Sequence, residues 1–468
     1  MNDYDVIVIG AGSTGENVAD RARAGGLTVA IVEDELVGGD CSYWACMPSK
    51  ALLRSAAALR AAQNVAGAAE AVTGDLDVSA VFARRDRTVH DWDDRGQVDW
   101  VESVGIDLVR GRAELTGVRE VAVRDADGGE RILTARHAVA VCTGSAAFMP
   151  DIPGLRDARP WTSREATSAK TAPSSLAILG GGVVGVEMAT AYAGFGTEVT
   201  VVSRGSLLSG QEPFAGELVQ KGLESLGATV KTGVQALSAH REDDLVLMEL
   251  DDGSTVTAEE VLVATGRTPR THGIGLDRVG LTDGDWLQVD DSLRVRGVDW
   301  LYGVGDVNHR ALLTHQGKYQ ARAAGDVIAA RANGAEIEDA AWGRHVATAD
   351  HRCVPQVTFS EPEVASVGLT AAAAAEAGLD IRVVDYELGH VAGSSLHADG
   401  YHGRARMVVD ETRRVIAGMT FVGQDVAELL QAATIAVVGE VPIDRLWHAV
   451  PAYPTMSEIW LRLLESYR

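Results

Sequence analysis

The sequence predicts an α/β protein with two parallel-sheet units of the same kind, followed by an α+β domain. A strand, a glycine-rich turn, a helix and a second strand follow one another near the N-terminus, and the same pattern returns with its first glycine at position 180 instead of 10. No such turn occurs after about residue 346, where short strand-like runs and two helical stretches remain. Alternating strands and helices favour a parallel sheet, and short successive strands favour an antiparallel one.

The first unit opens on the apolar run Val6–Ile9, which is typical of a buried parallel strand. Three glycines in G-x-G-x-x-G spacing follow it: Gly10, Gly12 and Gly15. We expect a helix over residues 16–24 and a second strand over 28–32 that ends at Glu33. The glycines allow a pyrophosphate to approach the backbone, the helix N-terminus stabilises its charge, and the acid binds ribose hydroxyls. This unit therefore predicts a dinucleotide site for an unphosphorylated ribose.

A cysteine pair, Cys41 and Cys46, follows directly after this unit. The next residues are dense in Ala, Leu and Arg and predict a helix, with Pro48 tolerated in its first turn. Both thiols are then at or near a helix N-terminus, where the helix dipole is expected to lower a thiol pKa. Two thiols beside a nucleotide site suggest redox chemistry. The alternative is that they are two small buried hydrophobic residues.

The second unit repeats the pattern, with a strand over 176–179, a helix over 187–195 and a strand over 198–202. Its glycines are Gly180, Gly182 and Gly185. Ser203 stands where the first unit has Glu33, and Arg204 follows it. An acid there would repel a ribose 2′-phosphate and a basic residue attracts it, so the second unit predicts NADP rather than NAD. The alternative is that Arg204 is an ordinary surface residue.

Three further strand ends carry candidate cofactor contacts. They are Thr143 and Gly144, Gly266, and Asp306, each after an apolar run. An acid at such a strand end can bind the hydroxyls of an extended cofactor. Cys142 belongs to one of these strands, and core packing is its expected role.

Composition limits the partners and the compartment. The 468 residues carry a net charge of −24, which argues against nucleic acid and anionic membranes as partners. Four cysteines are too few for a disulfide scaffold and indicate a reducing, cytoplasmic compartment. The acidic N-terminus runs straight into a strand, so we expect no signal peptide, and we expect neither a membrane-spanning helix nor a metal site.

Together these motifs resemble the class I pyridine nucleotide–disulfide oxidoreductases, which include glutathione, mycothione and mercuric reductases and lipoamide dehydrogenase. The resemblance extends over essentially the whole chain. It implies FAD on the first unit, a nicotinamide on the second, and a homodimer formed through the C-terminal domain. Ser203 and Arg204 favour NADPH as that nicotinamide, with NADH possible. The implied segments are 1–150 (FAD-binding, first part), 151–271 (NAD(P)-binding), 272–345 (FAD-binding, second part) and 346–468 (interface).

The resemblance also implies roles for individual residues. Cys46 would face the flavin, and Cys41 would be the interchange thiol that meets the substrate. Lys50 would lie near the flavin N5 and pair with Glu187, and Asp306 would bind the ribityl chain. Electrons would then pass from NADPH through the flavin to the Cys41–Cys46 disulfide and on to a small acceptor of the thiol or disulfide type.

The chain departs from the family pattern beside the cysteine pair and again near the C-terminus. Asp40 replaces a Thr before the first cysteine, and Tyr43 and Trp44 stand where the family favours small residues. Near the C-terminus Tyr453 occupies the position of the family's catalytic His, although Glu458 is in place five residues later. A phenol has a pKa of about 10 and is a poor base at neutral pH.

Two alternatives for the activity stay open, and Tyr453 bears on the first of them. In one, the same electron path ends on a metal ion, a quinone or another small electrophile, as in mercuric reductases. In the other, which is of a different class, the chain binds FAD without catalysing a reaction. The cysteine pair and Lys50 argue against this second alternative.

Overall fold

A computed structural model describes residues 2–468 and divides the chain into two compact units. The first unit comprises Met1–Pro48, Asp86–Ala147 and Arg267–His351. The second comprises Ser49–Arg85, Phe148–Gly266 and Arg352–Arg468. Each unit is assembled from three separate segments, so each depends on contacts between residues far apart in the sequence.

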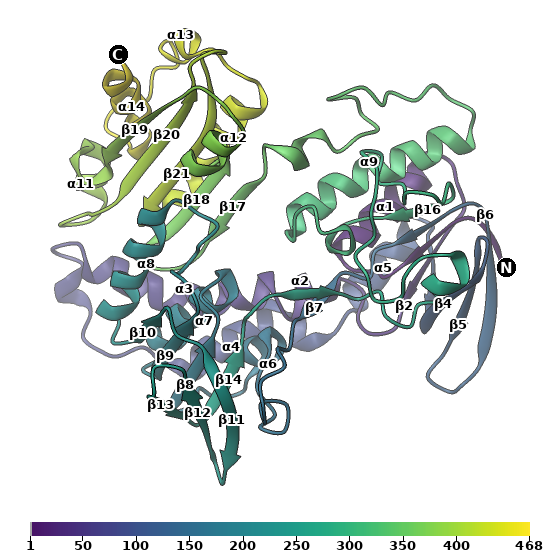
Figure 1. Ribbon diagram of the computed structural model, residues 1–468, viewed down its shortest axis with the longest axis horizontal. Coiled ribbons are helices and arrows are strands. Elements are labelled where there is room, and N and C mark those ends of the chain that lie inside the picture. The colour runs from purple at the N-terminus through teal and green to yellow at the C-terminus, as the bar shows by residue number, and fades with distance from the viewer. Residues whose placement is uncertain (1) are drawn as a thin grey trace. The chain divides into compact units, whose positions relative to one another are not determined.

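The first unit is built on a seven-stranded sheet with the order β3-β2-β1-β6-β5-β4, and with β16 paired to β6 (Figure 1). Its strands are β1 (Asp3–Ile9), β2 (Val29–Glu33), β3 (Asp107–Arg110), β4 (Arg112–Gly117), β5 (Glu120–Arg124), β6 (Glu130–Val141) and β16 (Leu301–Gly303). The pairs from β3 to β6 and β16 are parallel, and β6, β5 and β4 form an antiparallel meander. The short strands β7 (Ser145–Ala147) and β15 (Arg267–Pro269) pair separately.

Two long helices of the first unit pack against each other beside the sheet (Figure 1). They are α1 (Ser13–Ala24) and α9 (Thr314–Ala332). The close packing requires a small residue at Gly325, because a Cβ there would lie 2.5 Å from the Cβ of Arg21. The other helices of this unit are α2 (Gly39–Tyr43) and α5 (Arg95–Ser103), with 3₁₀ turns at His90–Trp92, Leu276–Val279, Asp306–Asn308 and Thr348–His351.

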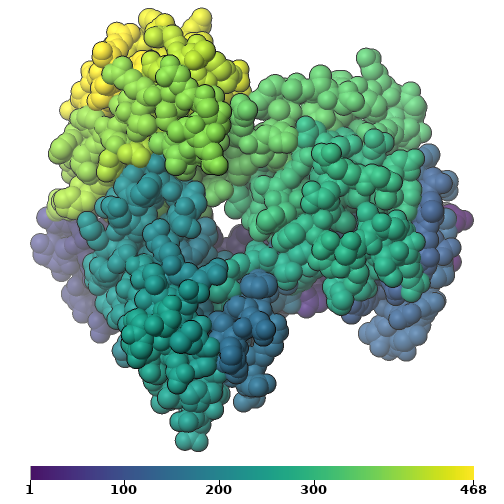
Figure 2. Space-filling model, in the orientation of Figure 1, coloured from purple at the N-terminus to yellow at the C-terminus, as the bar shows by residue number. Residues whose placement is uncertain are grey.

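The second unit contains a four-stranded parallel sheet with the order β10-β9-β8-β14. Its strands are β8 (Ser175–Leu179), β9 (Glu198–Ser203), β10 (Thr229–Thr232) and β14 (Glu260–Val263). Its helices are α3 (Cys46–Gln63), which begins in the first unit, α4 (Val78–Thr88), α6 (Ser163–Ser168), α7 (Val183–Gly194) and α8 (Pro213–Ser225), with a 3₁₀ turn at Ala69–Ala71. A further sheet holds β11 (Ala236–Glu242), β12 (Leu245–Leu250) and β13 (Thr255–Ala258). The tip between β11 and β12 projects from the surface of this unit (Figure 2).

The C-terminal part of the second unit is an antiparallel sheet with the order β17-β18-β21-β20-β19. Its strands are β17 (Pro355–Thr358), β18 (Glu363–Gly368), β19 (Ile381–Glu387), β20 (Arg404–Asp410) and β21 (Val415–Gly423). The helices are α10 (Ala371–Glu376), α11 (Ala392–His397), α12 (Leu430–Val438), α13 (Ile443–Leu446) and α14 (Ile459–Tyr467), with 3₁₀ turns at Leu388–His390, Val426–Leu429 and Met456–Glu458. Helix α12 packs on β18 and β21, and α14 packs on β19.

The predicted fold class is confirmed: both parallel-sheet units and the antiparallel C-terminal sheet are present. The mixed apolar and charged residues 84–104 also predict a single helical stretch, and this prediction is wrong because the stretch is broken in the middle. Asp91 has a φ of 52°, with positive φ values at His90 and Trp92 as well, so α4 ends before these residues and α5 begins after them. The four segment boundaries stay predictions. No helix within residues 2–468 is long and apolar enough to cross a membrane.

Candidate active site

The glycine turn of the first unit brings three backbone segments into direct contact. Gly10 has a φ of 98°, and a Cβ there would lie 2.6 Å from the carbonyl oxygen of Cys142. A Cβ on Gly15 would collide with the carbonyl oxygen of Gly10, so α1 starts directly against the end of β1. Beside it, a Cβ on Gly39 would lie 2.8 Å from the Cα of Gly12. Only glycine fits this turn, which leaves the N-terminus of α1 open to a phosphate group.

Glu33 ends β2 beside this turn and is tied to the backbone. Its Oε2 accepts a hydrogen bond of 2.7 Å from the N–H of Ala11, and its Oε1 accepts one of 2.9 Å from the N–H of Glu35. Burial raises the pKa of Glu33, and these two hydrogen bonds oppose the rise.

At the neighbouring strand end, the hydroxyl of Thr143 is buried and has no partner within residues 2–468, and Gly144 follows it with a φ of 75°. The glycine cradle, the acid and the orphaned hydroxyl fit an extended dinucleotide such as FAD.

Asp306 lies at the exit of β16 in a short polar chain. The hydroxyl of Ser145 donates a hydrogen bond of 2.5 Å to its Oδ2, and the Nε of Arg267 donates one of 2.5 Å to that hydroxyl. Burial raises the pKa of Asp306, and Ser145 and Arg267 oppose the rise. We did not predict Ser145 or Arg267 as site residues. Arg267 follows Gly266 directly, so its place in the motif was the available signal.

Asp40 is compensated by two arginines of the same unit. Its Oδ2 lies 3.4 Å from Nη2 of Arg270 and 3.9 Å from Nη2 of Arg267. The carboxylate that replaces the family's Thr therefore does not stand as an isolated charge at the start of α2.

The two redox cysteines are free thiols, both half-buried. Cys41 lies inside α2, and Cys46 is the first residue of α3 (Cys46–Gln63), with its Sγ 3.2 Å from the Oγ1 of Thr314. The expected lowering of the thiol pKa is wrong for Cys41: a hydrogen bond to Cys46 and burial raise its pKa, while Thr314 and Lys318 oppose the rise. Thr314 was not predicted; its position at the start of the helix after Asp306 was the only signal.

Tyr43 and Trp44 pack edge to face, with their ring centroids 5.7 Å apart. Tyr43 is fully buried, and its hydroxyl donates a weak hydrogen bond of 3.3 Å to Oε1 of Gln97. Burial, with a contribution from Asp94, raises the pKa of Tyr43 to about 12. The sequence leaves open whether this pair shapes the entrance for the substrate or only packs, and the burial of Tyr43 supports packing for that residue.

Lys50 and Glu187 form an ion pair in the second unit, with Nζ and Oε2 2.7 Å apart. Lys50 lies one helical turn after Cys46 on α3. Oε1 of Glu187 accepts a hydrogen bond of 3.0 Å from the N–H of Phe359, and the Lys50 ammonium lies 4.8 Å from the centroid of the Phe359 ring. The pairing is thus present in the structure, while the roles of the two residues in the reaction stay predictions.

The second glycine turn repeats the geometry of the first. Gly180 has a φ of 117°, and a Cβ on Gly185 would collide with the carbonyl oxygen of Gly180. Gly182 stands at the N-cap of α7, and Gly266 has a φ of 147° after the neighbouring strand.

The two residues after the second strand of this unit differ in exposure. Ser203 ends β9 and is buried, with its Oγ 2.7 Å from where a Cβ on Gly181 would stand. Arg204 is exposed and makes no hydrogen bond or ion pair with any residue in 2–468. Its guanidinium is therefore available to an anionic ligand.

Tyr453 and Glu458 form no hydrogen bond with each other within residues 2–468. Tyr453 is 76% exposed. Glu458 is buried and accepts a hydrogen bond of 2.5 Å from Nη2 of Arg462 through its Oε1, while its Oε2 is buried and has no partner among residues 2–468. The carboxylate of Glu458 is therefore engaged by an arginine on α14.

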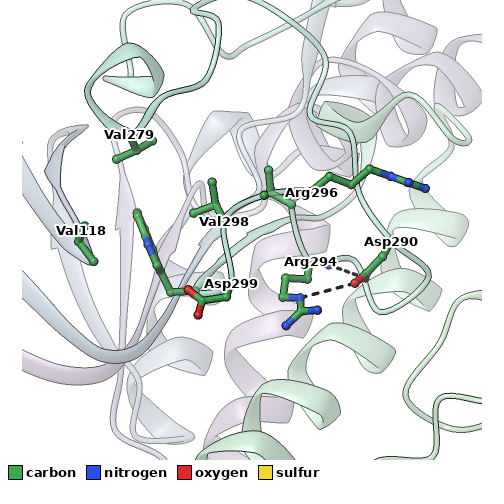
Figure 3. A pocket seen from close by; sticks show the side chains of 10 residues that line it. Val118, Val279, Asp290, Arg294, Arg296, Val298 and Asp299 are labelled. Atoms are coloured by element: carbon green, nitrogen blue, oxygen red, sulfur yellow. Dashed lines mark hydrogen bonds and ion pairs between the residues drawn. The ribbon is translucent and has the colours of Figure 1, made fainter.

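A surface pocket of about 800 Å³ lies elsewhere on the first unit (Figure 3). Its charges compensate each other, since Arg294 contacts Asp290 at 3.5 Å, and its apolar part includes Val118 and Val298. No predicted site residue lines it. The described part of the chain also has no cluster of three or more His, Cys, Asp or Glu side chains that could hold a metal ion.

Comparison with known protein families shows to which family the chain belongs. Residues 4–326 match the pyridine nucleotide–disulphide oxidoreductases, and residues 354–463 match the dimerisation domain of the same group. The chain belongs to this family. The first match covers more than half of the chain and contains both glycine turns and the cysteine pair.

Individual relatives agree with the family match. A dihydrolipoyl dehydrogenase of Chlorobaculum tepidum is 32% identical over 97% of this chain and 95% of its own length. A mercuric reductase of Streptomyces lividans is 31% identical over 97% of this chain and 94% of its own length. Among solved structures, the Cu(II) complex of the HOCl-induced flavoprotein disulfide reductase RclA from Escherichia coli has a TM-score of 0.86, 22% identity and full coverage of both chains.

Family membership confirms several predictions. The chain is an oxidoreductase of this family, whose members use FAD and NAD(P)H, and the matched dimerisation domain supports a homodimer. The alternative of a non-catalytic FAD-binding protein is set aside. The acceptor is not decided by these matches, because dehydrogenases and mercuric reductases both occur among the relatives.

The raised pKa of Cys41 predicts how the reduced protein reacts with alkylating agents. A thiol whose pKa lies above its ordinary value stays neutral at pH 7, and only the thiolate is alkylated. We therefore expect iodoacetamide to modify Cys41 slowly at pH 7, with a rate that rises about tenfold per pH unit through pH 9. Mass spectrometry of the reduced protein measures this rate.

The Cys46→Ala variant is the matched control for this measurement. It removes the hydrogen bond that contributes most to the shift, so alkylation of Cys41 should begin at lower pH. A rate for Cys41 in the wild type that is already maximal at pH 7 would contradict the prediction.

Proposed function

We propose that the chain is an NADPH-dependent reductase that passes an electron pair to a Cys41–Cys46 disulfide and on to a small acceptor. The observation that carries the proposal is the arrangement of the two thiols. Cys41 is hydrogen-bonded to Cys46, and Cys46, the first residue of α3, contacts the hydroxyl of Thr314. The few cysteines of the chain fit a cytoplasmic setting for this chemistry.

Residues of the first unit are suited to hold FAD. The glycine turn and the N-terminus of α1 would bind its pyrophosphate, Glu33 its ribose, and Asp306 its ribityl hydroxyls. FAD, when bound, accepts hydride from the nicotinamide and supplies an electron pair to a disulfide. The family resemblance implies that Lys50, which is paired with Glu187, would lie near the flavin N5.

The protein's own groups divide the charge of the reduced cysteine pair. Since the hydrogen bond to Cys46 and burial raise the pKa of Cys41, we assign the negative charge of the reduced pair to Cys46. The Thr314 hydroxyl can donate a hydrogen bond to that thiolate, and the first N–H groups of the 18-residue helix α3 favour negative charge at its start. Cys41 would then be the thiol that exchanges with the acceptor.

This charge division predicts an absorption signature. A Cys46 thiolate against oxidised FAD should give a long-wavelength band when the protein takes up two electrons. Cys46→Ser should abolish the band, and Cys41→Ser should show it without any reductant. Anaerobic titration of the purified protein tests this, and a purified wild type that carries no flavin refutes the proposal.

The nicotinamide site favours NADPH. Arg204 is exposed and uncommitted at the end of β9, and the position of the ribose-binding acid is held by Ser203. A charge-assisted hydrogen bond to a phosphate contributes about 1.5–3 kcal/mol.

Replacing this arginine should therefore change the choice of nucleotide. We expect Arg204→Ala to lower kcat/KM for NADPH by about 10-fold or more and to leave the value for NADH nearly unchanged. Steady-state kinetics with both nucleotides measure the effect. Equal losses with both, or a wild type that prefers NADH, would rule out the assignment.

The cysteine pair implies an acceptor of the thiol or disulfide type. Reduction of such an acceptor needs a proton donor and a base beside Cys41. In a homodimer the family geometry would bring Tyr453 and Glu458 to this site from the second subunit. A phenol serves as a donor but is a poor base, and Glu458 is already bonded to Arg462. Disulfide reduction by this route should therefore be slow.

A metal ion, a quinone or another small electrophile is the second candidate acceptor. Such acceptors do not release a thiolate that must be protonated, so the missing base affects them less. Mercuric reductases and dihydrolipoyl dehydrogenases both occur among the similar proteins, so the support for this class is the missing base and not the comparisons.

Tyr453→His distinguishes the two acceptor classes. General acid–base catalysis is worth roughly 10²–10⁴-fold, so the variant should reduce a small disulfide faster than the wild type by up to that factor. Reduction of Cu(II) or a quinone should change little. Rapid mixing of the NADPH-reduced enzyme with each acceptor measures these rates.

Arg462→Ala is the matched control, because it releases Glu458 from Arg462 without placing an imidazole at position 453, and it should not speed disulfide reduction. A wild type that reduces a small disulfide as fast as NADPH reduces its flavin would contradict this account. So would a Tyr453→His variant that is slower on every disulfide.

A further inference from the structure

A buried carboxylate that has no role in the proposed electron path lies in the first unit. The Asp350 side chain is only 1% exposed and belongs to the turn Thr348–His351. Its Oδ1 accepts a hydrogen bond of 2.8 Å from Nε2 of Gln316, and its Oδ2 accepts one of 2.9 Å from Nε2 of Gln320. Both glutamines belong to α9 and are buried.

Gln320 continues the chain of hydrogen bonds toward the exit of β16. Its Oε1 accepts a hydrogen bond of 2.8 Å from the N–H of Gly305 and one of 2.7 Å from Nδ2 of Asn308. Both partners are donors, so the amide of Gln320 can take only one orientation, with its Nε2 facing Asp350. Asp350 supplies the acceptor that this orientation requires.

The backbone held by Gln320 is the one that presents Asp306. Gly305 has a φ of 82° and a ψ of −148°, a conformation that only glycine adopts readily, and it immediately precedes Asp306. Losing the hydrogen bond to its N–H would leave this turn without its buried anchor.

The other end of the chain of hydrogen bonds fixes the start of α9. Gln316 is two residues after Thr314, whose hydroxyl lies 3.2 Å from Cys46. One carboxylate is thus connected to the turn before Asp306 and to the helical turn that contacts the redox thiol.

Opposing influences act on the pKa of the buried Asp350 carboxyl group. Burial raises its pKa, and the hydrogen bonds from Gln316 and Gln320, with the charges of Arg310 and His351, oppose the rise. Arg310 lies 3.9 Å from its Oδ2.

From this geometry we propose that Asp350 is a positioning residue for the FAD site, acting through Gln320 on Asp306 and through Gln316 on Thr314. The inference rests on the proposed binding of FAD to the first unit. It concerns hydrogen-bond geometry, so a substitution that keeps the acceptor oxygen should preserve the function and one that removes it should not.

Two substitutions at residue 350 separate geometry from charge. Asp350→Asn retains one oxygen for Gln320, and Gln316 can turn its amide to accept from the new Nδ2, so the apoprotein should bind FAD within about twofold of the wild type. Asp350→Ala removes the acceptor, and the loss of a buried hydrogen bond should weaken FAD binding by about tenfold or more. Fluorescence titration of the apoprotein with FAD measures both affinities.

Two variants at residue 316 keep the test decisive if Asp350→Ala does not fold. Gln316→Glu has the size of the native residue but sets a carboxylate against Asp350, and it should weaken FAD binding. The double variant Asp350→Asn with Gln316→Glu restores a donor and acceptor pair and should regain the wild-type affinity. The visible absorption spectrum of bound FAD should shift in the weakened variants and return in the double variant.

Arg331→Ala is the control for a loss of stability alone. Arg331 connects the far end of the same helix to Tyr302 and Ser292, so its removal should lower the unfolding temperature without changing FAD affinity.

The inference is overturned if Asp350→Ala and Gln316→Glu bind FAD as tightly as the wild type, or if Asp350→Asn is as weak as Asp350→Ala. A wild-type apoprotein that binds no FAD would overturn the proposed function as well.

Discussion

The direct contact between the end of a strand and the start of the next helix is the constraint on which each nucleotide unit depends. In the first unit the two backbones meet at Gly10 and Gly15, and in the second they meet at Gly180 and Gly185. The contact aims the helix N-terminus at the space beyond the sheet, where its free N–H groups can bind phosphate. Every other candidate cofactor contact of the first unit, including Glu33 and Asp306, is carried by a strand end of the same sheet.

Sequence patterns over a few neighbouring residues predicted the helices and strands that depend on those residues alone. Glycine spacing, buried apolar runs and helix-forming stretches predicted α1, α7 and the parallel strands within a few residues. The break between α4 and α5 was missed because three successive residues there have positive φ, and none of them is a glycine that would have indicated it. Backbone strain of that kind is imposed by the surrounding fold, and residue type does not reveal it.

The candidate site was predicted in part for the same reason. Residues inside a motif, such as the cysteines and Glu33, could be found from spacing. Thr314, Ser145 and Asp350 could not, because their partners are distant in the sequence and their residue types are common in any fold. The pKa of Cys41 was predicted with the wrong sign because the helix dipole was considered and the hydrogen bond between the two thiols was not.

Helix α3 is continuous from Cys46 through Lys50 to Gln63, with no bulge or kink between the thiol and the lysine. In an α-helix each residue turns the chain by about 100°, so the direction of Lys50 relative to Cys46 depends on the number of residues between them. A substitution at Met47 or Ser49 leaves that direction intact, whereas inserting or deleting one residue would turn Lys50 away from Glu187. The number of residues between Cys46 and Lys50 is therefore a constraint of its own, separate from the identity of those residues.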